Sequence, residues 1–422
     1  MKYIEEKLST PVTHDFEVIV CGGGPAGVAA ALAAARRGAR TALVETNGCL
    51  GGTWTAGLVS HIIDHQDKDG IIREICLEMT VRKGKGLNED YDPEMLKALL
   101  EEMVGRENIF LRYHTMVAAA VKSGKRLTHV ILESKSRREA WSGKVFIDAT
   151  GDGDLAAMAG CQFDFGRPED GMSQPFSMIA MLGGLNAAQI SPYYNHPESR
   201  MQHKQRLCEL LSRHGATPSY AAPTLFHLSD DLFLMMSTHF YGGCAFNADD
   251  LTAATVTARA EILCQVNALR KAGMPWANIR LLATSARVGV REGRRIHCRY
   301  MVSRDDLATG KKHHDAVCRV NFGVDIHSPD PEQSKEIYRV NRVDAKPYDI
   351  PYRALLPLDV DGLLVAGRCI GGDFQAHASY RVTGNACVLG EVAGRAAADA
   401  IKGGFLPHEL PTETTLVGII PT

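Results

Sequence analysis

The chain has 422 residues, of which 45% are hydrophobic and 23% charged, and its formal net charge is −2. This length favours two domains, and the composition is typical of a soluble globular protein. A charge so close to zero argues against long-range attraction to nucleic acid or to an anionic membrane. The sequence contains no run of 18 apolar residues, so no membrane span is expected. The first 13 residues lack the apolar core of a signal peptide, which makes the cytoplasm the default expectation.

The sequence contains eleven cysteines, an odd number, and no CxxC pair. We expect them to be small buried hydrophobic residues in a reducing compartment, because a redox disulfide would need a closely spaced pair. The spacing of histidines and cysteines matches no known metal site, so no metal is expected.

The first predicted elements are a strand over residues 17–21, a glycine-rich turn, a helix over 28–37 and a strand over 41–45. The helix is rich in alanine, the best helix former, and Gly38 is placed to end it. Pro25 stands just inside the helix start, where its missing N–H is tolerated.

The turn between the first strand and the helix reads GGGPAG over residues 22–27 and places Gly22, Gly24 and Gly27 in a GxGxxG pattern. The first glycine permits the tight turn, the second lets the backbone approach a pyrophosphate, and the third lets the helix pack closely on the strand. Glu45 ends the second strand at the spacing where a carboxylate binds ribose hydroxyls. Strand, turn, helix and acid together predict a dinucleotide-binding site.

Further along, a helix is predicted over residues 92–105 and a strand over 108–113. Three short strands follow at 116–121, 127–134 and 140–147, with polar turns between them. Short strands joined by such turns predict a β-meander.

Residues 161–346 differ in composition from the first part of the chain, because they contain most of the histidines. Two strands are predicted there, over 175–182 and 232–239, and one long helix over 249–272. After them a buried strand over 362–367 and an alanine- and glycine-rich helix over 385–401 return to the texture of the first part.

Four motifs then carry a family resemblance: LGGT at 50–53, DATGD at 148–152, LVAGR at 364–368 and RVTGNA at 381–386. With the GxGxxG turn they resemble the FAD-dependent oxidoreductase family of the glutathione-reductase-like superfamily. They are most similar to its branch related to fumarate reductase and succinate dehydrogenase flavoproteins. Looser matches extend into the middle, as STH at 237–239, REGRRI at 291–296 and DIH at 325–327.

The resemblance implies an α/β fold: a Rossmann-type FAD-binding domain with a β-meander, plus an inserted α+β substrate domain. Residues 1–160 and 347–422 would form the FAD-binding domain, and residues 161–346 the insertion. The residues that the resemblance assigns to FAD are Gly22, Gly24, Pro25, Ala26, Gly27, Glu45, Thr46, Gly51, Gly52, Thr53, Val117, Ala149, Thr150, Gly151, Gly367, Arg368, Gly384, Asn385 and Ala386.

Individual roles follow from the resemblance. Gly51 and Gly52 would let the backbone pass beside the pyrophosphate and the flavin, and Val117 would offer its backbone to adenine. Thr150 and Gly151 would close over the adenosine. Arg368 stands where many relatives carry an acid, and its charge suits a pyrophosphate. Residues 384–386 begin the last helix, whose positive end would face the flavin N1–C2 carbonyl edge.

Interpreted as a strand, residues 287–299 alternate, with Arg287, Arg291, Arg295, His297 and Arg299 on one face. This face is either an anion-binding surface for a carboxylate substrate or a solvated edge with salt bridges. The family resemblance makes Arg291 and Arg294 the pocket members.

Three histidines are candidate acid–base groups. His327 has Asp325 two residues before it on the same face of an extended segment, as a general acid or base requires. His239 and His377 are weaker candidates, and each is equally explained as a structural side chain. His61, after the Gly51–Gly52 turn, is the nearest candidate for a covalent link to FAD.

The sequence therefore predicts an FAD-dependent oxidoreductase that moves a hydride between a small polar or carboxylate-bearing substrate and N5 of FAD. Two alternatives stay open: a flavoprotein that passes electrons to a protein or dithiol partner, and a flavin-binding protein without turnover. The expected partner is a small molecule, with no nucleic acid and no membrane, and a homo-oligomer stays open.

Overall fold

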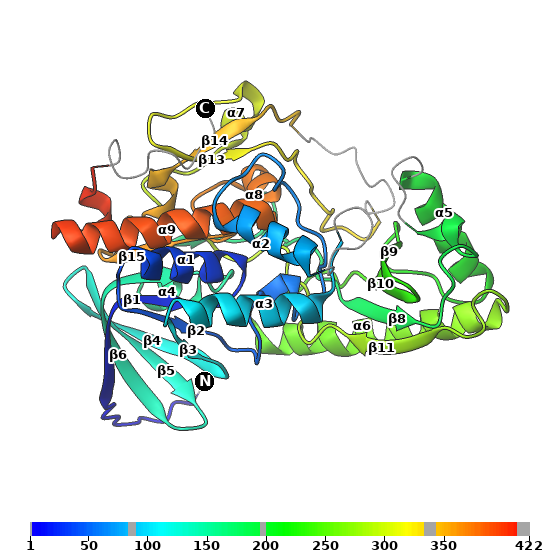
Figure 1. The fold of residues 1–422 in the computed structure, drawn as a ribbon, viewed down its shortest axis with the longest axis horizontal. Coiled ribbons are helices and arrows are strands. Elements are labelled where there is room, and N and C mark those ends of the chain that lie inside the picture. The colour runs from blue at the N-terminus through cyan, green and yellow to red at the C-terminus, as the bar shows by residue number, and fades with distance from the viewer. Residues whose placement is uncertain (1, 83–89, 195–199, 333–342, 412–422) are drawn as a thin grey trace.

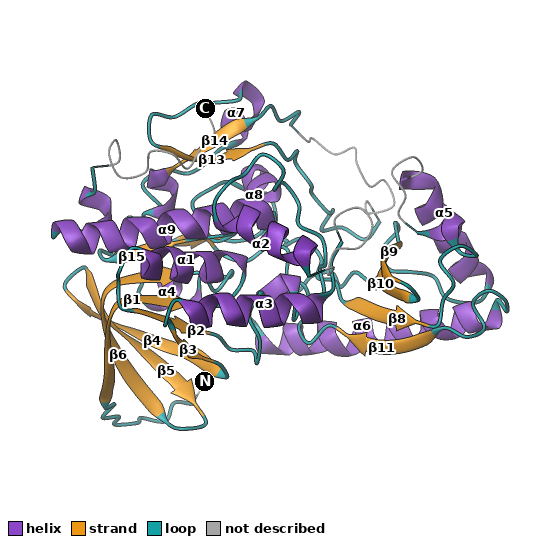
Figure 2. Cartoon of the chain, in the orientation of Figure 1, coloured by secondary structure: helices purple, strands orange, loops and turns teal. Residues whose placement is uncertain are grey.

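This computed structural model describes residues 2–82, 90–194, 200–332 and 343–411 (Figure 1). A large sheet covered by helices occupies one end of the molecule, and a smaller sheet backed by two helices occupies the other. Figure 2 shows the same division by element type, with loops concentrated between the two sheets. In the described segments, none of the helices is both long and apolar enough to cross a lipid bilayer.

The large sheet has seven strands in the order β3-β2-β1-β6-β5-β4, and β15 also pairs with β6. Its strands are β1 (Val12–Cys21), β2 (Thr41–Val44), β3 (Phe110–Arg112), β4 (Thr115–Ser123), β5 (Arg126–Ser134), β6 (Arg138–Asp148) and β15 (Leu363–Val365). Strand β6 joins two sub-sheets. Its first half pairs antiparallel with β5, and its last residues pair parallel with β15. The predicted Rossmann-type sheet and its β-meander are both present, sharing one long strand.

Two helices, α1 (Pro25–Arg36) and α9 (Thr383–Gly403), pack side by side against this sheet. Their closeness comes from small residues. A Cβ on Gly390 would lie 2.0 Å from the Ala26 carbonyl oxygen, and one on Gly394 would lie 2.1 Å from that of Ala30. A chain segment 360 residues away thus completes the core around the glycine-rich turn. Helices α2 (Ile71–Val81) and α3 (Pro93–Arg106) pack beside them.

The smaller sheet has the order β11-β8-β10-β9. Its elements are β8 (Ile179–Gly183), β9 (Thr224–Ser229), β10 (Leu232–Met236) and β11 (Arg280–Thr284), with helices α5 (Arg200–Arg213) and α6 (Ala248–Lys271) behind them. Helix α6 is capped by Asn247, whose side chain accepts from the backbone N–H of Asp249 at 2.9 Å. Strands β8 and β10 are shorter than the predicted 175–182 and 232–239, because Phe176 and Phe240 pair only as an isolated bridge beyond them.

The remaining elements are α4 (Asp154–Met158), β7 (Phe163–Asp164), β12 (Arg295–Ile296), α7 (Arg304–Thr309), β13 (Ala316–Val320), β14 (Tyr348–Pro351) and α8 (Phe374–Tyr380). Buried side chains from Ile296 to Val343 belong to the core of the large sheet, whereas the core behind the small sheet runs from Met178 to Trp276 and Ile279. We therefore propose that the inserted unit ends before Ile296 and is smaller than the predicted residues 161–346. The limit at residue 160 stays a prediction.

The prediction of one strand over residues 287–299 is wrong. Only Arg295 and Ile296 are extended there, as the short strand β12. Two glycines interrupt the rest: Gly289 pairs with Ser177 as an isolated bridge, and Gly293 lies so close to Asp152 that a Cβ would be 2.3 Å from its carboxylate. The arginines consequently point into different surroundings. Arg295 is buried against Glu292, and Arg299 is exposed.

Candidate active site

A first cavity lies where the carboxyl ends of four parallel strands meet two helix N-termini. Gly22 follows β1, Glu45 follows β2, Ala149 follows β6 and Ala366 follows β15, and all four line it. Ligands of open α/β sheets bind at this edge. The N-termini of α1 and α9 border the same space, so unpaired backbone N–H groups and two positive dipole ends face it.

The glycines of the turn have separate steric reasons. Gly22 has φ of 100°, and a Cβ there would lie 2.4 Å from the Ala149 carbonyl oxygen. A Cβ on Gly27 would lie 1.7 Å from the Gly22 carbonyl oxygen. Around Gly24, by contrast, the space is open, which leaves the backbone accessible to a ligand. The three positions match the three roles predicted for the GxGxxG pattern.

Glu45 connects the turn to the strand that follows it. One carboxylate oxygen accepts from the Gly23 N–H at 2.6 Å, and the other accepts from the Asn47 backbone N–H at 2.7 Å. The side chain is only 4% exposed, yet it borders the first cavity. The oxygen that accepts from the Asn47 backbone also accepts from the Asn47 side-chain amide at 2.5 Å. The carboxylate is therefore held in place, and the oxygen that accepts from Gly23 keeps a lone pair for a ligand.

A second cavity adjoins the first. Seven residues line both cavities: Thr53, Gly57, Gly289, Val290, Arg368, Arg381 and Thr383. The polar end of the second cavity carries Arg291, Asp325 and His327. A ligand in the first cavity and a ligand in the second would therefore meet across a shared wall.

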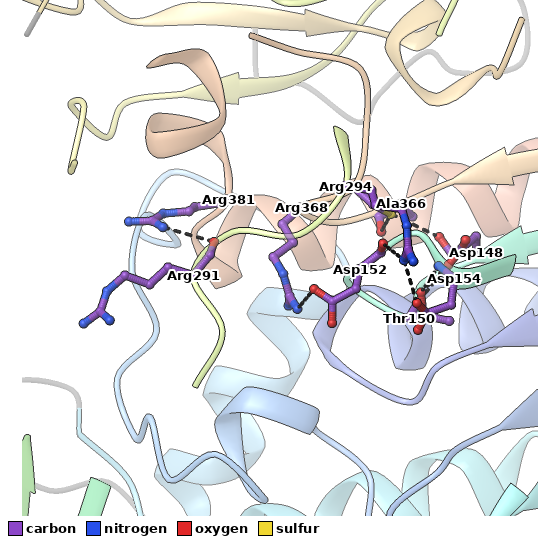
Figure 3. Close-up of polar contacts among 10 residues, drawn as sticks. Asp148, Thr150, Asp152, Asp154, Arg291, Arg294, Ala366, Arg368 and Arg381 are labelled. Atoms are coloured by element: carbon purple, nitrogen blue, oxygen red, sulfur yellow. Dashed lines mark hydrogen bonds and ion pairs between the residues drawn. The ribbon is translucent and has the colours of Figure 1, made fainter. Parts of the chain in front are cut away.

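Arg381 organises the polar end of the second cavity. Its guanidinium donates to the carbonyl oxygens of Arg291 at 3.0 Å and Asp325 at 2.8 Å. Figure 3 shows the Arg381 and Arg291 guanidinium groups on one side of the site, apart from the pair formed by Arg368 and Asp152 at 2.7 Å. The His327 imidazole lies 3.4 Å from the Asp325 carboxylate. Two cations and a carboxylate–imidazole pair thus meet at one place.

The family model described as FAD dependent oxidoreductase matches residues 17–416. The chain belongs to this family. FAD is its cofactor, and it is an FAD-dependent oxidoreductase with the predicted α/β fold. Its predicted place in the branch related to fumarate reductase stays a prediction.

Other comparisons are more distant. A dihydrolipoyl dehydrogenase from Trypanosoma brucei brucei is 51% identical over 43 residues, which span 10% of this chain and only 9% of that protein. A geranylgeranyl bacteriochlorophyll reductase-like protein from Thermoplasma acidophilum is 11% identical, with 93% of this chain and 80% of that chain covered and a TM-score of 0.49. The p-nitrophenol 4-monooxygenase from Pseudomonas putida DLL-E4 is 12% identical, with 93% and 81% covered and a TM-score of 0.45.

The oxidoreductase holds His327 neutral at physiological pH. Burial and the Arg291 charge lower the pKa of His327 to about 4, although the nearby Asp325 carboxylate acts in the opposite direction. Burial and the Arg381 charge lower the pKa of Arg291 to about 10, which leaves Arg291 cationic at neutral pH. The site therefore pairs a permanent cation with a neutral imidazole that can accept a proton.

Of the residues predicted to bind FAD, most border the first cavity. These are Gly22, Gly24, Pro25, Ala26, Glu45, Gly52, Thr53, Ala149, Thr150, Gly151, Gly367, Arg368 and Ala386. Six others lie outside its lining: Gly27, Thr46, Gly51, Val117, Gly384 and Asn385. Steric requirements account for three of them. Gly27 packs on the Gly22 carbonyl, a Cβ on Gly51 would meet Thr55 at 2.7 Å, and one on Gly384 would meet the Asp64 carbonyl oxygen at 2.2 Å.

The predicted catalytic residues separate into two groups. Arg291 and His327 line the second cavity, and the His239 ring lies behind His327, with 5.2 Å between ring centroids. Arg294 and His377 line neither cavity. Arg294 bonds to Asp154 at 2.8 Å, and the fully buried His377 packs its ring on Tyr380. The candidate site therefore does not include Arg294 or His377.

Two residues of the second cavity were not assigned catalytic roles from the sequence. Arg381 lies within the RVTGNA motif, but only its following residues were expected to matter. His61 lines the second cavity and pairs with Asp90 at 3.1 Å. Asp152, the last residue of the DATGD motif, is buried and paired with Arg368.

The first cavity fits FAD on its own chemistry. The Thr383 hydroxyl is buried and has no hydrogen-bond partner among the described residues, although it stands on the wall between the two cavities. A buried polar atom needs a partner, and a bound flavin would supply acceptors there. Within the described ranges, no cluster of three or more His, Cys, Asp or Glu side chains could hold a metal ion.

Proposed function

We propose that this oxidoreductase moves a hydride between a carboxylate-bearing substrate in the second cavity and FAD bound in the first. One observation supports this above the others: Arg291, Asp325, His327 and Arg381 meet in a cavity that shares its wall with the cavity of the FAD motifs. Bound FAD supplies two-electron redox chemistry at the N5 edge of its flavin.

In this proposal the residues around the first cavity hold the cofactor. Glu45 would accept charge-assisted hydrogen bonds from the ribose hydroxyls, and the backbone at Gly24 would bind the pyrophosphate at the start of α1. The N-terminus of α9, with Thr383 and Ala386 on the cavity wall, would hold the flavin and favour negative charge on it. The Arg368 guanidinium would interact both with the Asp152 carboxylate and with the ligand.

The residues around the second cavity position the substrate and move its proton. Arg291 binds the carboxylate with its planar guanidinium, and Arg381 holds the backbone that carries Arg291 and Asp325. His327, neutral at pH 7, accepts the proton that leaves when the substrate is oxidised, and Asp325 stabilises the resulting imidazolium. In the opposite direction the same imidazolium returns the proton.

The cofactor assignment is tested first on the purified protein. We expect a yellow protein with a flavin absorbance band that releases FAD rather than FMN on denaturation. A colourless protein that does not take up added FAD would contradict the assignment of the first cavity. Photoreduced protein is then screened for metabolites that reoxidise it, which identifies substrates for the next experiment.

The role of Arg291 is tested by stopped-flow measurement of flavin reduction in the wild type, Arg291→Ala and Arg291→Lys. We expect both variants to retain FAD but reduce it more slowly, with poor rescue by lysine because it lacks the planar fork. Arg299→Ala is the matched control, since Arg299 is exposed and lines neither cavity. Equal rates in all four proteins would place Arg291 outside the substrate site.

A further inference from the structure

The two central strands of the small sheet, β8 and β10, are apolar on both faces, which is unusual for an antiparallel sheet with helices on one side only. Side chains alternate along β8 and β10, so each strand presents one residue set to each face. Ala180, Leu182, Phe233 and Met235 belong to the core that also contains α5 and α6. An antiparallel sheet backed on one face normally carries polar residues on the other.

The opposite face carries four large apolar residues instead. Ile179 and Met181 come from β8, Leu234 and Met236 come from β10, and they lie in register as the pairs Leu234–Met181 and Met236–Ile179. They form a separate small cluster with Leu58 from the loop after the Gly51–Gly52 turn. No described helix packs over this face among the contacts of the small sheet.

The second cavity explains why this face of the sheet is apolar. Ile179, Leu234 and Met236 line it, together with Phe226 of β9 and with Leu58 and Val59 from the loop that packs on this face. Charged side chains line another part of the same cavity, namely Arg291, Arg381, Asp325 and His327. One cavity thus combines an extended apolar wall with a group of charged residues.

We infer that the substrate is an amphipathic carboxylate whose apolar chain or ring system lies along the part of this face formed by Ile179, Leu234 and Met236. The carboxylate part rests on the proposed function, while the apolar body rests on the sheet face alone. Charge complementarity places the head at Arg291, and the shared wall with the first cavity places the adjoining carbons next to the flavin site. This inference makes the substrate larger and more apolar than the predicted small polar or carboxylate-bearing molecule.

The inference is tested by calorimetry, which measures the affinity of the FAD-loaded protein for straight-chain monocarboxylates from butanoate to decanoate. A parallel series of primary alcohols of the same lengths lacks the charged head. We expect each added methylene to tighten binding about three- to fourfold until the cavity is filled, since burial of a CH₂ has a nearly constant effect. Carboxylates should bind more tightly than alcohols of equal length.

Two methionines provide a matched pair of variants. Met236→Gln places a polar group in the cavity wall and should weaken decanoate about tenfold while leaving butanoate nearly unchanged. Met181→Gln is the control, because Met181 lies on the same sheet face in the neighbouring strand but does not line the cavity. It should leave the whole series unchanged.

The outcomes separate the two ideas. A chain-length dependence in both series without any preference for carboxylates would contradict the proposed head group and leave the apolar body supported. Binding that is independent of chain length, in a protein that still prefers carboxylates, would overturn the inference and leave the proposed function standing. A change of oligomeric state in Met236→Gln, with unchanged binding of decanoate, would also overturn it, because the face would then be an interface between copies.

Discussion

The Glu45 carboxylate both stabilises the glycine-rich turn and lines the cofactor cavity. Its two oxygens already accept from Gly23 and Asn47, so its position is set before any ligand arrives. Preorganised acceptors lose little entropy on binding, which is why one residue can contribute strongly to cofactor affinity.

We expect Glu45→Gln to weaken FAD binding about 10- to 150-fold, the range for a lost hydrogen bond to a charged group. The measurement is fluorescence titration of apoprotein with FAD. Glu17→Gln is the control, because Glu17 pairs with Lys144 and borders neither cavity. Affinity that stays unchanged in Glu45→Gln, in a folded protein, would show that Glu45 does not bind the ribose.

His327 should titrate far below an ordinary histidine. In the free enzyme we expect an imidazole midpoint at about pH 4, against an ordinary value of 6.5, measured by NMR titration. Arg291→Gln should raise this midpoint, because the Arg291 charge disfavours the imidazolium. A wild-type midpoint near 6.5 would contradict both the burial and the electrostatic account.

The same shift has a consequence for stability. The folded-state pKa of His327 lies below its unfolded value, so on acidification the unfolded chain binds the proton first. This group therefore makes no contribution above about pH 6.5 and destabilises the fold progressively as the pH falls from 6.5 towards 4. We expect His327→Gln to flatten that part of the profile of unfolding free energy against pH, measured with urea.

At the scale of elements, the contact between α1 and α9 sets the distance between the two helix N-termini that face the first cavity. We expect Gly390→Ala to destabilise the protein by about 1–3 kcal/mol and to weaken FAD binding, because its Cβ would lie 2.0 Å from the Ala26 carbonyl oxygen. Thermal unfolding and FAD titration measure the two effects.

Gly105→Ala is the matched control for this contact. Gly105 lies in α3 with open space around its Cβ position, so alanine should stabilise the helix by about 0.5–1 kcal/mol. If Gly390→Ala behaves in the same way as Gly105→Ala, the two helices can separate without cost, and close packing does not define the cofactor site.

The whole molecule depends on a last segment that returns to the first sheet. Strand β15 pairs with the end of β6, and α9 buries most of its residues against α1 and the large sheet. We therefore expect a chain ending at residue 346 to be insoluble and to hold no FAD. Co-expression of residues 347–422 should restore a soluble yellow complex, measured by co-purification and flavin absorbance. A truncated chain that folds and retains FAD by itself would contradict this dependence.

The sequence alone determined the local chemistry. The GxGxxG turn, Glu45 and the RVTGNA motif are contiguous signals whose backbone requirements are local, so their structures follow from short-range sterics and helix capping. They led to the fold and to FAD. His327 and Asp325 could also be paired in advance, because two residues of separation places them on one face of an extended segment.

Only the tertiary structure decided how distant segments share a cavity. The family resemblance grouped Arg291 with Arg294 as pocket members, but the segment is broken at the glycines 289 and 293, and only Arg291 lines the second cavity. His377 precedes a flavin-facing motif closely, yet α8 turns it into the core. The apolar wall was invisible in sequence, because core and cavity residues of β8 and β10 are equally hydrophobic. Which face is backed by helices depends on long-range packing, and that packing separates structural from substrate-facing side chains.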